Sequence, residues 1–172
     1  MHQNKKVREM SSTVYGKKLV KKTKRSNHEV KKRMLQLSAM NYNCSQIMTL
    51  LALEQAGYDN TDLVRAMSGL GDGCGFLNET CGVMTSAACL LAWYGGNKSG
   101  NETESDLVPP MLQDLGEWFR QKTANKCKGT RCKDILGDQV GTPTGKKLCG
   151  ALIFETHNKV NEILTSYGFS GA

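Results

Sequence analysis

The segment at residues 43–57 reads NCSQIMTLLALEQAG, and it predicts a helix with both ends marked. Asn43 can accept a hydrogen bond from the first turn, and Gly57 can adopt the left-handed conformation that ends many helices. Between them, apolar residues recur every three or four positions, which is the period of one helix face. We therefore expect a helix over 44–56.

The same helical signals recur along most of the chain, and no long stretch alternates with the period of two that marks a strand. Expected N-caps include Ser26 or Asn27, Asp59 or Asn60, and Asn78 or Thr80. Four glycines within residues 69–75 predict a loop. The further helices are expected at about 28–40, 61–67, 81–94, 107–124, 131–136 and 146–167. Together they predict an all-α fold, a compact bundle of about six helices.

Basic residues are concentrated at the start of the chain. Residues 1–33 hold 12 of the 23 Lys and Arg but only two of the 16 acidic residues, so this part carries +10 and the rest −3. We expect residues 1–26 to form a basic, mobile tail and residues 27–172 to form the helical domain. The tail could bind phosphate or an acidic partner, but a solvated extension is the favoured interpretation. Because the domain is mildly acidic, nucleic acid is not an expected partner.

The chain contains seven cysteines, and it shows no apolar run long enough for a membrane span or a signal peptide. With an odd cysteine count and no export signal, we expect a cytoplasmic protein in a reducing compartment. Clustered cysteines in such a compartment are typical of metal, cluster or redox chemistry.

Four cysteines share one setting, because each lies in the first turns of an expected helix and is followed three and four positions on by mainly apolar residues. Such positions lie on one helix face, so each thiol should point inward at the start of a packed stripe. We therefore expect these four thiols to converge at one end of the bundle. The partial positive charge of helix N-termini should favour their thiolate forms. The four are Cys44, Cys81, Cys132 and Cys149.

The other cysteines and the histidines have different expected roles. Cys89, within an apolar helix segment, is expected to be a small core residue. Cys74 in the glycine run and Cys127 in a polar stretch are accessory candidates. All histidines are expected to be solvated, with His157 on the polar side of the last helix. Catalytic residues therefore remain unassigned.

The order of these motifs resembles a known family, the redox-active proteins named for the pattern C_GCAxxG_C_C. The resemblance covers about residues 28–166, and it departs from the pattern at three positions. Thr80 stands for the first Gly, Val83 for the Ala and Ser86 for the last Gly, so helix packing there should be looser. The matching parts are Tyr42–Gln46, the glycine run, Thr80–Ser86, Cys132–Gly137 and Cys149.

This resemblance implies a redox function in the cytoplasm. The family is related to the non-haem part of split-Soret cytochromes, in which four cysteines hold an iron-sulfur cluster. It therefore implies that Cys44, Cys81, Cys132 and Cys149 are cluster ligands, and four thiolates complete a two-iron, two-sulfur cluster. A c-type haem is not expected, because the chain has no Cys-x-x-Cys-His.

Three functions fit these residues. The first is electron transfer or redox sensing through an iron-sulfur cluster, with a redox partner protein. The second is thiol-disulfide chemistry without metal, in which one thiolate attacks and a neighbour resolves. The third is a structural zinc site in an interaction protein, where the cysteines tie helices together. The first two would make the protein an oxidoreductase or an electron-transfer component, and the sequence does not indicate an oligomeric state.

Overall fold

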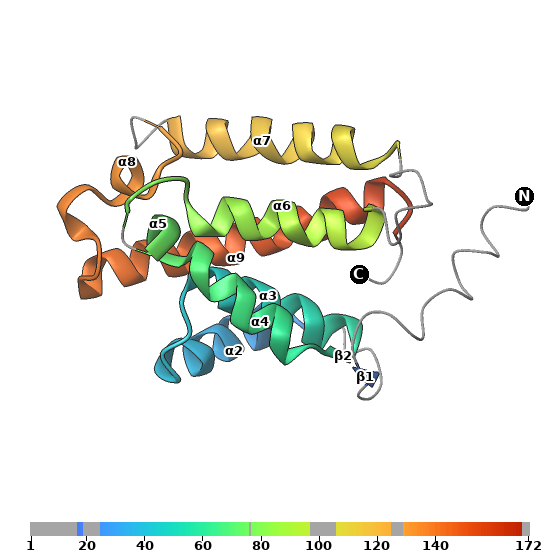
Figure 1. Ribbon diagram of the computed structural model, residues 1–172, viewed down its shortest axis with the longest axis horizontal. Coiled ribbons are helices and arrows are strands. Elements are labelled where there is room, and N and C mark those ends of the chain that lie inside the picture. Colours follow the sequence, from blue (N-terminus) through green and yellow to red (C-terminus); the bar gives the residue numbers. More distant parts are fainter. Residues whose placement is uncertain (1–16, 19–24, 76, 97–105, 125–128, 170–172) are drawn as a thin grey trace, which may run out of the picture.

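The computed structural model describes residues 17–18, 25–75, 77–96, 106–124 and 129–169. Within these ranges the predicted all-α bundle is confirmed (Figure 1). A short antiparallel pair, β1 (Lys17–Lys18) and β2 (Tyr58–Asp59), is added to it. The helices are α2 (Asn27–Ala39), α3 (Cys44–Ala56), α4 (Thr61–Met67), α6 (Gly82–Gly95), α7 (Val108–Ala124), α8 (Cys132–Leu136) and α9 (Pro143–Ser166).

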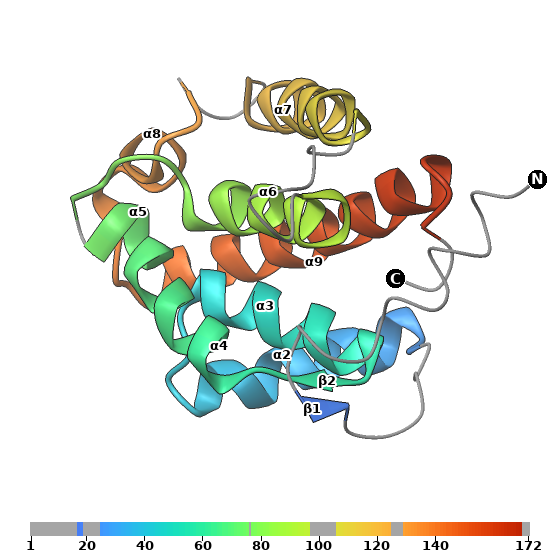
Figure 2. The same ribbon diagram turned by 45° about the vertical axis from the view of Figure 1, so that its right-hand side comes forward.

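Helix α6 lies at the centre of the bundle. It contacts α3, α7 and α9, with α7 on one side and α3, α4 and α2 on the other (Figures 1 and 2). Val83, Ala87 and Leu91 recur every four residues along α6, and each is 0% exposed. Because α6 is packed against helices on several sides, its position is fixed, and the residues at its two ends are held in place with it.

The capping residues act as the sequence predicts. Asn43 Oδ1 accepts a hydrogen bond from the backbone N–H of Gln46 at 3.1 Å, and Gln46 Oε1 accepts one from the Asn43 N–H at 3.3 Å. Gly57 ends α3 with φ 75°. Ser26 caps α2 with the same reciprocal pair of bonds, whereas Asn60 caps α4 only by accepting a hydrogen bond from the Leu63 N–H. These local bonds explain why α3 has the expected bounds.

Three local expectations were wrong. Helix α9 begins at Pro143 rather than near 146, because Thr142 Oγ1 accepts a hydrogen bond from the Gly145 N–H at 3.1 Å and Pro143 suits the first helical position. Cys81 itself is the N-cap of α6, instead of Asn78 or Thr80. The glycine run forms a 3-10 turn, Ser68–Leu70, followed by the short turn α5 (Gly71–Gly75).

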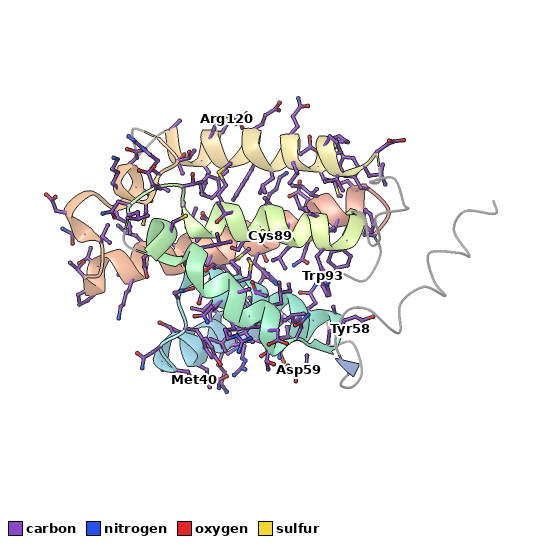
Figure 3. The ribbon with its side chains drawn as sticks, viewed as in Figure 1. Met40, Tyr58, Asp59, Cys89, Trp93 and Arg120 are labelled. Atoms are coloured by element: carbon purple, nitrogen blue, oxygen red, sulfur yellow. The ribbon has the colours of Figure 1, made fainter. Side chains whose placement is uncertain are left out.

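Two burial expectations were also wrong. His157 is 4% exposed rather than solvated, since α9 is contacted by α2, α3, α6 and α7. Cys89 is exposed rather than in the core, and Figure 3 labels it midway along α6. His28 is exposed as expected.

The expected N-terminal tail falls largely outside the described residues. Of its described part, Lys17–Lys18 pairs with β2, and Arg25 Nη1 lies 2.7 Å from Glu54 Oε2 of α3. Among the described residues, no helix is long and apolar enough to cross a membrane.

Candidate thiol site

Cys81 and Cys132 are brought together by two short segments that pair in antiparallel fashion. The Cys81 N–H donates to the Thr130 carbonyl at 3.1 Å, and the Cys132 N–H donates to the Glu79 carbonyl at 2.7 Å. Both cysteines are buried. The pairing therefore joins the start of α6 to the start of α8, although the two cysteines are 51 positions apart in the sequence.

Cys44, the first residue of α3, lies against the start of α6. A Cβ atom added to Gly82 would lie 3.0 Å from Cys44 Sγ and would overlap the carbonyl oxygen of Leu70. Only glycine fits at this position, so the residue that follows Cys81 allows Cys44 to approach it. This requirement gives a physical reason for a glycine within the cysteine motif.

The turn α5 connects the surroundings of Cys44 and Cys132. Asp72, Gly73, Cys74 and Gly75 have φ values of 53°, 67°, 62° and 68°, so φ is positive at four successive residues. Non-glycine residues rarely adopt this conformation and persist there only when their surroundings hold them. Here the turn is held by close contacts at two of its glycines, Gly71 and Gly73.

Those contacts are made on both sides of Asp72. Gly71 packs on the Asn43 side chain, and a Cβ on Gly73 would lie 2.8 Å from Cys132 Cβ. In both ribbon views α5 and α8 lie at the same end of the molecule (Figures 1 and 2).

Cys149 joins the other three from α9. It is the seventh residue of that helix, so it lies further from the helix start than expected. Its side chain is half-buried. Its thiol interacts electrostatically with Cys44, Cys81 and Cys132. Cys81 likewise interacts with Cys44 and Cys132, and Cys132 with Cys44. A thiolate at any one of the four positions would therefore be repelled by thiolates at the other three.

The ionisation of the four thiols differs from the expectation. Burial, followed by the repulsion of neighbouring thiolates, raises the pKa of Cys81 and Cys149 to about 12 and that of Cys132 to about 11. Burial also raises the pKa of Cys44. Backbone N–H groups at Cys44 and Cys81 favour the thiolates, as helix starts should, but burial outweighs them. In the metal-free protein the thiols are therefore protonated near neutral pH.

By their chemistry the four thiols are suitable ligands for a soft metal or an iron-sulfur cluster, because both bind thiolates preferentially. Within the described ranges, however, no group of three or more His, Cys, Asp or Glu side chains is close enough to hold a metal ion. Binding would therefore require the thiols to move together and lose their protons.

The other cysteines differ in how the structure describes them. Cys74 lies in α5, is half-buried and carries a free thiol. Cys127 lies outside the described residues. Cys89 lies midway along α6. Their roles, and the ligand roles of the four thiols, stay predictions.

Comparison with protein families gives one match. The family model described as "Putative redox-active protein (C_GCAxxG_C_C)" matches residues 42–163. The chain belongs to this family. A search of curated proteins and a search of solved structures give no match. The family's redox-active character agrees with a site built from thiols, and the matched region contains all four of them.

Sequence reasoning missed the part played by α5 and by Gly82. The glycines at 69, 71, 73 and 75 were visible in the sequence and predicted a loop. The sequence did not show that the partners would be Asn43 and Cys132, because those contacts join segments far apart in the chain.

Proposed function

We propose that the protein carries out electron transfer or redox sensing through an iron-sulfur cluster of the two-iron, two-sulfur type. Cys44, Cys81, Cys132 and Cys149 would be its ligands. What supports this most is that the four thiols, from four separate elements, are near enough for their thiolate forms to raise one another's pKa. Four thiolates are the number that such a cluster requires.

The surroundings of the thiols favour this function over a reactive thiol. A nucleophilic cysteine needs a lowered pKa, whereas burial and mutual repulsion raise the pKa of all four thiols. A bound cationic group would offset that repulsion. When bound, a cluster would accept and release single electrons, and the buried walls of the site would exclude water from it.

The backbone would contribute as well. The N–H of Asp72 lies near the Cys44 sulfur, and the N–H groups of Val83 and Met84 lie near the Cys81 sulfur. Such N–H groups stabilise negative charge on ligand sulfurs and shift the reduction potential of a cluster. A redox partner protein would supply or receive the electron.

Anaerobic purification followed by iron and sulfide analysis tests the proposal. We expect a brown protein with visible absorption, and we expect Cys→Ala replacement of any of the four ligands to abolish or greatly reduce it. Cys89→Ala is the matched control, because its thiol is exposed on α6 and should leave the spectrum unchanged. Bound zinc without visible absorption would instead support the structural alternative.

A second candidate, thiol-disulfide chemistry, is favoured by the pairing of the Cys81 and Cys132 segments. Residues on paired segments can come close enough for a disulfide after a small shift of the backbone. A thiol count that falls by two under mild oxidant, in protein without iron, would support this candidate. A count that does not change would exclude it.

A further inference from the structure

Asp72 is held beside the thiols by its own backbone. Its N–H lies near the Cys44 sulfur. The preceding Gly71 packs on the Asn43 side chain, and the following Gly73 packs on Cys132 Cβ. These contacts fix the residue between the starts of α3 and α8, where its carboxylate interacts with Cys44, Cys132 and Cys149.

The charge of this carboxylate is not offset by the cation that precedes Cys132. Arg131 precedes Cys132, but its guanidinium donates to both carboxylate oxygens of Asp134, at 2.9 Å and 3.0 Å. Among the ion pairs formed within the described residues, none includes Asp72. The site therefore presents a fixed negative charge next to three of its four thiols.

We propose that Asp72 is a specificity-determining residue of the thiol site, which disfavours anionic redox partners and admits neutral or cationic ones. A like charge a few ångströms from a reacting sulfur lowers the local concentration of anions. The inference deepens the proposed function because it concerns the same thiols. It requires only that they react, with or without a metal.

Paired alkylation rates test this in the reduced, metal-free full chain. Neutral iodoacetamide and anionic iodoacetate are attacked at the same kind of carbon by the same thiolate, and each loses iodide. The ratio of the two rates therefore cancels the amount of thiolate and reports the charge beside the sulfur. Peptide mass spectrometry would give the ratio separately at Cys44 and Cys149, which are half-buried, and at the exposed Cys89.

We expect Asp72→Asn to lower the ratio of iodoacetamide to iodoacetate rates at Cys44 and Cys149 by about threefold, as one nearby charge would in water. Asparagine tolerates the left-handed backbone, so the turn should keep its shape. Asp72→Glu should retain most of the selectivity. Asp138→Asn removes an equal charge from an exposed position and should leave the ratio unchanged. Cys89 should be unaffected throughout.

An unchanged ratio in Asp72→Asn, or an equal change in Asp138→Asn, would overturn the inference. A change at Cys89 as large as that at Cys44 would overturn it as well, since it would indicate a general effect of net charge. Failure of the chain to take up iron would count against the proposed function alone, because this experiment uses protein without metal.

Discussion

At the scale of single residues, His157 links burial to the pH dependence of stability. Burial is the largest cause of its lowered pKa, and the nearby Arg25 lowers that pKa further. The unfolded chain, with a pKa of about 6.5 for this group, therefore binds the proton first as the pH falls. The contribution of neutral His157 to stability is fully present above that pH and is lost below it.

We expect the free energy of unfolding to decrease as the pH falls from 7 through about 6.5 towards the lowered pKa of His157. His157→Gln should flatten this part of the profile, whereas His28→Gln, at an exposed position, should not. Chemical denaturation across this pH range is the measurement. A wild-type profile that stays flat there would contradict the role assigned to His157.

A second residue-scale prediction concerns Gly82. A methyl group there would overlap the Leu70 carbonyl and press on Cys44 Sγ. We expect Gly82→Ala to reduce the free energy of unfolding by about 2 kcal/mol, since overpacking near the backbone costs roughly 1–3 kcal/mol.

Gly150→Ala is the matched control for Gly82, because it lies within α9 with open space around it. That change should instead stabilise the helix by roughly 0.5–1 kcal/mol. A free energy of unfolding that is unchanged or raised in Gly82→Ala would show that the Gly82 contacts do not matter.

At the scale of elements, both ends of α3 were predictable, whereas the start of α9, the N-cap of α6 and the exposed faces of α6 and α9 were not. Asn43 and Gly57 act within a few residues of themselves, so their roles could be predicted without knowing the rest of the fold. The burial of His157 and the exposure of Cys89 depend on which helices cover α9 and α6, and that information is not local. That the four thiols converge stays a prediction, which rested on assigning each to an apolar stripe, whereas the position of Asp72 depends on a turn with no regular period.

The turn α5 gives a prediction at this scale. Cys74 holds a left-handed conformation, with φ 62°, that costs a residue with a side chain roughly 1–2 kcal/mol. We expect Cys74→Gly to raise the free energy of unfolding by about 1 kcal/mol. Asn41→Gly, at a residue with φ 63°, should raise it by less because asparagine tolerates this conformation. Loss of stability in Cys74→Gly would indicate that its thiol is needed for packing.

At the scale of the whole molecule, the N-terminal segment should contribute little to folding. A two-residue strand pair and one partly exposed ion pair, Arg25 with Glu54, are its described contacts. Deleting residues 1–24, which retains that ion pair, should lower the free energy of unfolding by less than about 1 kcal/mol. Calorimetry would show one cooperative transition in both forms, and a broad or missing transition in the shortened chain would contradict this.

The length of the central helix α6 also separates the thiol-bearing end of the molecule from the end that carries β1 and β2. Cys81 begins it, while Trp93 near its other end packs on Tyr58 of β2, which pairs with Lys18 (Figures 1 and 3). Fourteen helical residues span roughly 20 Å, more than twice the screening length in physiological salt. A chain attached to an electrode or resin at the β1–β2 end would therefore present its sulfur-bearing end to the solution, with the electrostatics of that end unaltered by the attachment.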